Sequence, residues 1–145
     1  LYKLTKERKI MSTRSGIGYL TPEGKVRAIY CHFDGYVTNG VGETLITEWQ
    51  AAYRVAQLVE SGHMSQLGVD LKDSVFYGRD RGESDTDTNE FESILEFSNY
   101  YLDGCDYVYL YTRDGWLVQT DERRTFTRVD TYLQAEKNME NAHAL

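Results

Sequence analysis

The sequence predicts a single α+β domain built on one mainly antiparallel sheet, in the order ββ-α-β-α-ββ-α. Three observations predict this class. The length of 145 residues is that of one domain, and the hydrophobic and charged fractions of 41% and 27% are typical of a globular protein. The strand-like and helix-like segments also lack the regular βα alternation of a parallel, doubly wound sheet. We expect the domain to cover residues 11–138 and residues 139–145 to form a flexible tail.

The first third of the chain predicts a hairpin followed by a helix. Residues 15–20 and 25–32 have the character of strands and flank Thr21-Pro22-Glu23-Gly24, a turn with proline at its second position and glycine at its fourth. Apolar residues then recur at three- or four-residue steps over residues 43–60, and Gly62 follows where a left-handed C-cap would lie. We expect one continuous amphipathic helix over residues 43–60.

The middle of the chain combines a short strand, a polar loop and a second helix. We predict the strand over residues 73–77, and the loop over residues 78–87 because these are polar. Asp87 and Glu90 have the spacing of a capping box, which marks a helix start. We expect this helix to end at Gly104 and to bury one apolar stripe, formed by Phe91, Ile94, Leu95, Tyr101 and Leu102.

The last third predicts a second hairpin and a closing helix. Residues 106–112 alternate in character, so one face of the strand carries Tyr107, Tyr109 and Tyr111, and the other carries Val108 and Leu110. Asp114-Gly115 favours a two-residue type I′ turn, after which residues 116–120 should return antiparallel. The closing helix is marked by Phe126, Val129 and Leu133.

Composition restricts the class of partner. The net charge of −7 disfavours binding to a nucleic-acid backbone, which requires clustered lysine and arginine. Twelve tyrosines can pack in a core or line an interface. The two cysteines, Cys31 and Cys105, together with the lack of a long apolar segment, indicate the reducing cytoplasm and no membrane span. The sequence is compatible with a homo-oligomer as well as with a monomer. No motif indicates a cofactor.

The first ten residues differ from the rest. They carry a charge of +3, which leaves −10 for residues 11–145. Lys6-Glu7-Arg8 can be encoded by a ribosome-binding sequence a few codons before Met11. We expect Met11 to be the natural start and residues 1–10 to be a flexible, basic leader; the alternative is a genuine basic arm.

The segment 30–36 gathers four candidate binding residues, namely Tyr30, His32, Asp34 and Tyr36. Cys31 and His32 are neighbours on a strand, so their side chains leave opposite faces and cannot form a nucleophile–base pair. The cysteine and histidine spacing of a zinc site is also missing from the sequence. We therefore predict no catalytic residue and no metal. The enzymatic alternative is acid–base chemistry by His32 with Asp34 and Glu83.

The segment 77–83 is the second candidate site, with Tyr77, Arg79, Asp80, Arg81 and Glu83. Two arginines near glycines on a loop can hold a phosphate or carboxylate, because glycine lets the backbone approach a ligand closely. The same residues can instead form a network of ion pairs that fixes the loop to the rest of the domain. The sequence leaves both interpretations open.

Several motifs resemble those of a family of small phage-encoded proteins of uncharacterised function. They are Met11-Ser12-Thr13-Arg14-Ser15, the Tyr-Cys-His-Phe-Asp-Gly-Tyr run over residues 30–36, Gln66-Leu67-Gly68, the Arg79–Glu83 loop and the strand over residues 107–110. The resemblance covers most of residues 11–135, and the family's opening motif begins at Met11. It implies a phage accessory protein that acts in the cytoplasm of an infected bacterium.

Two binding functions follow from this resemblance by analogy. The first is a non-enzymatic counter-defence inhibitor that binds a host defence protein through its acidic, tyrosine-bearing surface. The second is a sponge that sequesters a nucleotide second messenger, with Arg79 and Arg81 on the phosphates and Tyr36 or Tyr77 stacked on a base. The second function requires a concave pocket.

Overall fold

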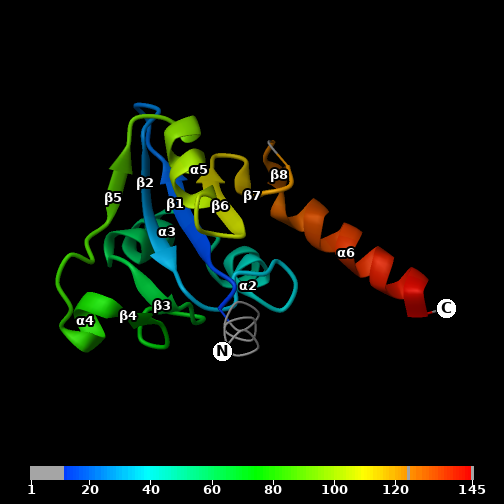
Figure 1. Cartoon of the computed structure of the whole chain (residues 1–145), viewed down its shortest axis with the longest axis horizontal. Coiled ribbons are helices and arrows are strands. Elements are labelled where there is room, and N and C mark those ends of the chain that lie inside the picture. Colours follow the sequence, from blue (N-terminus) through cyan, green and yellow to red (C-terminus); the bar gives the residue numbers. More distant parts are fainter. Residues whose placement is uncertain (1–11, 124, 145) are drawn as a thin grey trace, which may run out of the picture.

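The computed structural model describes residues 12–123 and 125–144. Its strands are β1 (Ser15–Leu20), β2 (Val26–Cys31), β3 (Met64–Gln66), β4 (Val75–Phe76), β5 (Asn89–Phe91), β6 (Tyr107–Thr112), β7 (Gly115–Thr120) and β8 (Thr127–Arg128). Its helices are α2 (Val41–Glu48), α3 (Ala52–Glu60), α4 (Tyr77–Arg81), α5 (Ile94–Leu102) and α6 (Val129–Ala144). Together they form the single α+β domain that the sequence predicts (Figure 1). The predicted leader over residues 1–10 lies outside the described residues.

One mixed sheet runs through the molecule in the order β4-β3-β2-β1-β6-β7-β8, and β5 pairs with the edge of β2. Most pairings are antiparallel, as predicted, but β1–β6 and β2–β3 are parallel. Parallel neighbours need a crossover connection. The chain passes through α2 and α3 between β2 and β3, and through α5 before β6, so these helices lie in the two crossovers.

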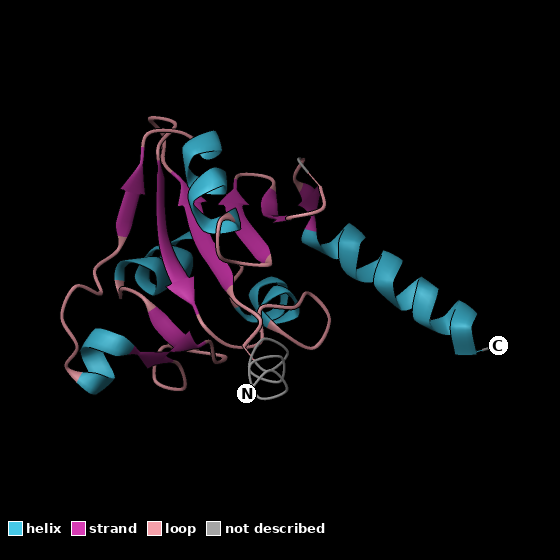
Figure 2. Ribbon diagram, viewed as in Figure 1, coloured by secondary structure: helices cyan, strands magenta, loops and turns pink. Residues whose placement is uncertain are grey.

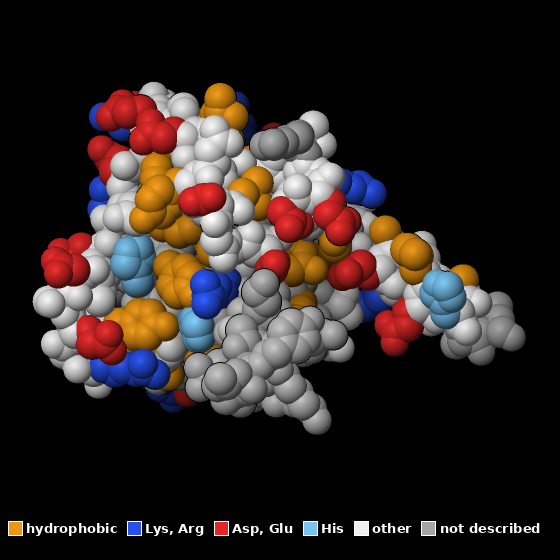
Figure 3. All heavy atoms as spheres, viewed as in Figure 1, with side chains coloured by type: hydrophobic (Ala, Val, Ile, Leu, Met, Phe, Trp, Pro, Cys, Tyr) orange, Lys and Arg blue, Asp and Glu red, His pale blue; other side chains and the backbone are white. Residues whose placement is uncertain are grey.

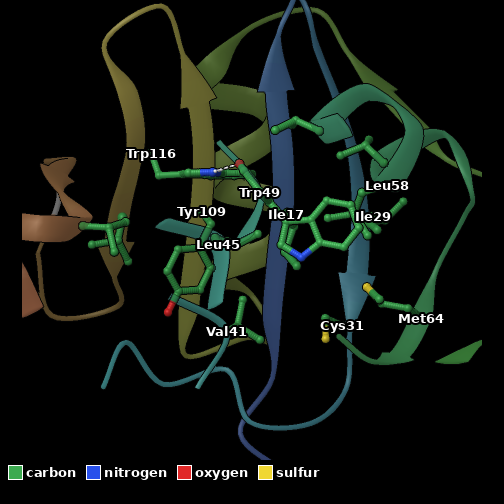
Figure 4. Packing of buried hydrophobic residues seen from close by; sticks show 14 of the residues in the cluster. Ile17, Ile29, Cys31, Val41, Leu45, Trp49, Leu58, Met64, Tyr109 and Trp116 are labelled. Atoms are coloured by element: carbon green, nitrogen blue, oxygen red, sulfur yellow. Dashed lines mark hydrogen bonds between the residues drawn. The ribbon is translucent and has the colours of Figure 1, made fainter. Parts of the chain in front are cut away.

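Helices cover both faces of the sheet, and each face has its own core (Figure 2). On one face Ile17 and Tyr109 pack with residues of α2, α3 and α6 (Figure 4). On the other face Val108 and Leu110 pack against α5. The strand β6 therefore divides its side chains between the two cores, as its alternating pattern predicts.

The single helix predicted over residues 43–60 is wrong, because the chain breaks between α2 and α3. The Trp49 carbonyl accepts a hydrogen bond from Trp116 Nε1–H at 2.8 Å (Figure 4). The Gln50 carbonyl accepts one from the Tyr111 hydroxyl at 2.7 Å. Side chains of β6 and β7 thus occupy two carbonyls that a continuous helix would use in its own ladder.

The second helix begins later than the predicted capping box. Residues 89–91 form β5 instead, because the edge of β2 offers them a pairing partner. The helix α5 starts after Ser93, whose Oγ accepts a hydrogen bond from the Glu96 N–H at 3.1 Å. These two residues have the same spacing as the predicted box. Leu95 is 69% exposed, so the predicted apolar stripe is wrong at that residue.

Other local differences are smaller. The hairpin β6–β7 is present, but in its turn only Gly115, with φ 93°, is left-handed, which indicates a type I turn with a glycine bulge rather than type I′. Residues 77–81 form α4, which begins at the last residue of the predicted strand and continues into the predicted loop, and the strand β3 was not predicted. The helix α6 continues to Ala144 and extends away from the sheet (Figure 1).

Candidate functional site

A cleft of about 950 Å³ opens on the face of the sheet that α5 covers. Its lining comes from segments far apart in the sequence: the residue before β1, the end of β2, the residues that follow α3, the start of α4, the segment 83–86, β5 and the end of α5. Four tyrosines line it, namely Tyr30, Tyr77, Tyr100 and Tyr101. Figure 3 shows hydrophobic, histidine and basic side chains gathered on this face, with acidic side chains around them.

The close approach of α5 to β1 shapes the floor of the cleft. A Cβ atom at Gly16 would lie 2.4 Å from Cγ of Tyr101, so only glycine admits this ring. Tyr101 is 3% exposed, and its hydroxyl accepts a hydrogen bond from Asn89 Nδ2 at 3.4 Å. Burial raises the pKa of Tyr101. The floor therefore joins α5, β1 and β5 through one neutral tyrosine.

Tyr30 and His32 extend from the same face of β2, two residues apart. The Tyr30 hydroxyl lies 2.7 Å from His32 Nδ1. Burial raises the pKa of Tyr30 to about 12, so this hydroxyl keeps its proton at neutral pH and can donate to the ring nitrogen. Burial, followed by the charges of Arg14 and Arg81, lowers the pKa of His32. Both side chains are therefore neutral near pH 7.

Arg14 supplies the positive charge of the cleft, and it was not among the residues predicted from the sequence. It lies just before β1, on the same face as Gly16. Burial raises the pKa of Tyr30, Tyr77 and Cys105, and the charge of Arg14 opposes this effect at each of them. Within residues 12–123 and 125–144, its guanidinium has no hydrogen-bond or ion-pair partner. No residue within these ranges occupies its five donors, which can bind an anionic ligand.

A second arginine lies near the same rings. Arg81 is 5.1 Å from the ring centre of Tyr77 and 3.8 Å from the Glu83 carboxylate. Tyr77 and Glu83 both line the cleft. Burial raises the pKa of Tyr77, and the charge of Arg81 opposes this effect. At His32 the charge of Arg81 adds to the lowering of the pKa by burial and by Arg14. Three residues of the two predicted segments thus line the cleft with Arg14, namely Tyr30, Tyr77 and Glu83. His32 contacts Tyr30 and Arg81 contacts Tyr77 beside them.

Arg79 and Asp80 have a structural role instead. Arg79 donates to the Leu71 carbonyl at 2.8 Å and to the Ser74 carbonyl at 2.7 Å, and it pairs with Asp80 at 2.9 Å. Asp80 in turn accepts a hydrogen bond from the Phe76 N–H at 2.7 Å. Neither residue lines the cleft. For Arg79 and Asp80, the geometry favours the structural network of ion pairs over an anion-binding site.

Asp34 and Tyr36 lie outside the cleft, in the tight loop that connects β2 to α2. The Asp34 carbonyl accepts from the Val41 N–H at 2.7 Å, and a Cβ at Gly40 would lie 2.5 Å from the carbonyl oxygens of Asp34 and Tyr36. Tyr36 lines a different groove, which also contains Tyr107. The structure therefore does not bring the predicted residues of the segment 30–36 into one site.

The cleft offers little for nucleophilic or acid–base catalysis. Cys31 is buried on the opposite face, and Cys105 is 7% exposed at the cleft. Burial raises the pKa of each thiol to about 12, so both stay protonated near neutral pH. No carboxylate is among the groups that shift the pKa of His32. The arrangement suits binding better than the route through His32, Asp34 and Glu83.

In the described part of the chain, no three histidine, cysteine or acidic side chains lie close enough together to hold a metal ion. None of the described helices combines the length and apolar character needed to cross a membrane.

Comparison of the chain with protein-family models, with curated proteins and with solved structures finds no match.

Proposed function

We propose that this protein binds and sequesters a small nucleotide-class ligand in the cleft. The observation that carries the proposal is the meeting of four tyrosines with Arg14, a guanidinium that has no partner among the described residues. Aromatic rings stack on a nucleobase, and a guanidinium binds phosphate through paired hydrogen bonds. The volume of about 950 Å³ lies in the range of small-molecule sites.

The remaining polar residues of the cleft fit the same class of ligand. Glu83, Asp85 and Asp103 lie along it and can accept hydrogen bonds from ribose hydroxyls. Asn89 and Asn99 carry amides that can donate to and accept from a base edge. In a phage accessory protein, such a cleft would act as a sponge for a nucleotide second messenger of the host.

Isothermal titration calorimetry with 3′,3′-cyclic di-AMP and with ADP-ribose tests this proposal. We expect at least one of them to bind with micromolar or tighter affinity. Arg14→Ala should weaken that binding at least about tenfold, because a hydrogen bond to a charged group contributes about 1.5–3 kcal/mol.

Arg113→Ala is the matched control, because Arg113 is exposed at the turn after β6, at the opposite end of that strand from Arg14. It should leave the affinity unchanged. Absence of binding by both compounds at high micromolar concentration contradicts the proposal.

A second candidate function is inhibition of a host protein with a basic surface. It is favoured by a separate groove that carries three tyrosines, Tyr36, Tyr107 and Tyr132, beside Asp106, Asp121 and Glu122. Tyrosine is enriched at protein interfaces, and complementary charge favours association. Pull-down from bacterial lysate at low and high salt tests this candidate, which requires a defence protein to be recovered at low salt only.

A further inference from the structure

His63 joins the floor of the cleft to two of its walls. Its N–H donates to the Thr86 carbonyl at 2.8 Å, and its carbonyl accepts from the Tyr77 N–H at 3.2 Å. Its ring Nδ1 accepts a hydrogen bond from the Tyr30 N–H at 3.0 Å. One residue therefore connects β2, the start of α4 and the segment 83–86, all of which line the cleft.

The imidazole of His63 fills a gap in the sheet. Along the outer edge of β2, the pairing with β5 ends at Ala28, and the pairing with β3 is at Cys31. The Tyr30 N–H lies between these two pairings. The ring nitrogen takes the place of the strand carbonyl that is missing there, so a backbone donor that would otherwise lack a protein partner is satisfied.

This hydrogen bond defines the charge state of His63. A ring nitrogen that accepts from an N–H carries no proton, so the neutral ring has its proton on Nε2. Burial lowers the pKa of His63, and the charge of Asp87 opposes this effect. The other titratable or charged groups that line the cleft are Arg14, Tyr30, Tyr77, Glu83, Tyr100, Tyr101, Asp85, Asp103 and Cys105. None of these is among the groups that shift the pKa of His63.

We propose that His63 is a pH-sensitive latch, which holds the cleft in its binding shape when neutral and releases Tyr30 when Nδ1 is protonated. Protonation converts the acceptor into a donor, so two N–H groups face each other across 3.0 Å. The attraction that holds β2 to the residues after α3 then becomes a repulsion. Ligand affinity should fall as the pH falls through the pKa of His63, which burial places below the ordinary histidine value of 6.5. Only this effect on affinity rests on the proposed function.

Nuclear magnetic resonance tests the latch without any ligand. In ¹⁵N-labelled protein, the ring nitrogens of His63 and the exchange protection factor of the Tyr30 amide are followed from pH 7.5 to pH 4.5. We expect an unprotonated Nδ1 at pH 7.5, and loss of Tyr30 protection over the range in which that nitrogen gains a proton. His63→Asn offers an amide oxygen in place of Nδ1 and should keep the Tyr30 amide protected throughout.

His143→Asn, a change on the exposed end of α6, is the matched control and should retain the transition of the unmodified protein. Two results overturn the latch. One is a His63 ring that already carries a proton on Nδ1 at pH 7.5. The other is a Tyr30 amide whose protection does not change while His63 becomes protonated.

Calorimetry with ADP-ribose and 3′,3′-cyclic di-AMP at pH 7.5 and pH 5.0 extends the test to binding. We expect affinity to fall at least about twofold at pH 5.0 in the unmodified protein, and the ratio between the two pH values to shrink in His63→Asn. An unchanged ratio overturns the role of the latch in binding. If neither compound binds at either pH, the proposed function fails, and the protection of the Tyr30 amide still decides whether the latch exists.

Discussion

Two buried serines differ in their hydrogen bonding, which gives opposite predictions for the same substitution. Ser15 is fully buried, and its hydroxyl has no hydrogen-bond partner in the described part of the chain. Ser15→Ala removes an unsatisfied polar group, so we expect the free energy of unfolding to rise by about 1 kcal/mol. Denaturant unfolding, monitored by tyrosine and tryptophan fluorescence, measures the change.

Ser98→Ala is the matched control for this prediction. The Ser98 hydroxyl donates to the Gln119 side-chain carbonyl, and both residues are buried. Its removal leaves the glutamine oxygen unsatisfied and should lower the free energy of unfolding by about 1–3 kcal/mol. Equal effects of the two substitutions would show that hydrogen bonding does not decide the outcome.

Single residues of the site were only partly predictable from the sequence. Tyr30, Tyr77 and Glu83 were selected because their segments carry unusual combinations of side chains, and they do line the cleft. Arg14 was not selected, because it is one basic residue next to an ordinary strand. Gly16 and Gly18, on one face of β1, were the available signal that another element approaches closely there. The ring that approaches Gly16 belongs to Tyr101 of α5, more than 80 residues later in the chain.

At the scale of elements, the two arginines of α4 should differ in how much each stabilises the fold, with Arg79 contributing more than Arg81. Arg79 holds the carbonyls of Leu71 and Ser74 and stacks 4.7 Å from the ring centre of Phe76. Its side chain is 41% exposed, so solvent screening reduces the contribution of its charge. We expect Arg79→Ala to lower the free energy of unfolding by about 1–2 kcal/mol.

Arg81→Ala is the companion change. The side chain of Arg81 is 49% exposed and forms one long ion pair with Glu83, so its removal should change stability by less than about 1 kcal/mol. Thermal unfolding of both variants measures the difference. If Arg81→Ala were the more destabilising change, α4 would be fixed to the fold in another way.

The packing of α5 on β1 gives a second prediction at this scale. Gly16→Ala places a Cβ atom 2.4 Å from the Tyr101 ring, so α5 or the strand must move. We expect a loss of about 1–3 kcal/mol in the free energy of unfolding, as for other overpacked cores. Gly104→Ala adds a methyl group with nothing within 4 Å and should be tolerated. A Gly16→Ala variant as stable as the unmodified protein would contradict the close approach.

Elements were predictable where local pattern decides them. The strands β1, β2, β6 and β7 follow from alternation and from turn residues that lie beside them in the sequence. The break between α2 and α3 was not predictable, because its cause is the capture of the Trp49 and Gln50 carbonyls by Trp116 and Tyr111, more than 60 residues away. The short strand β5 likewise exists because β2 offers an unpaired edge.

At the scale of the whole molecule, the sequence predicted the α+β class, but the cleft depends on long-range topology. The parallel pairing of β1 with β6 places Arg14, before β1, beside Asp106, whose N–H donates to the Arg14 carbonyl at 3.0 Å. The same pairing brings Cys105 and the end of α5 to the cleft. A purely antiparallel arrangement of these two strands would have placed Arg14 at the other end of β6.

The stability of the whole domain should depend on pH in two steps. His32 and His63 both have a pKa below the ordinary 6.5 in the folded protein, mainly because of burial. The unfolded chain therefore binds more protons than the folded protein just below pH 6.5, so stability is lost as the pH falls from 6.5 through the lowered values. Glu60 adds the lower step, because hydrogen bonds from Arg27 hold its pKa below the ordinary 4.5. That contribution is present above pH 4.5 and is lost as the pH falls through the lowered value.

The midpoint of thermal unfolding, measured from pH 8 to pH 3, should show both steps. His63→Asn removes one of the two histidines and should reduce the upper step while it leaves the lower step in place. A midpoint that stays constant between pH 7 and pH 5 in the unmodified protein would show that neither histidine is held neutral by the fold, and the latch at Tyr30 would then lack its driving force.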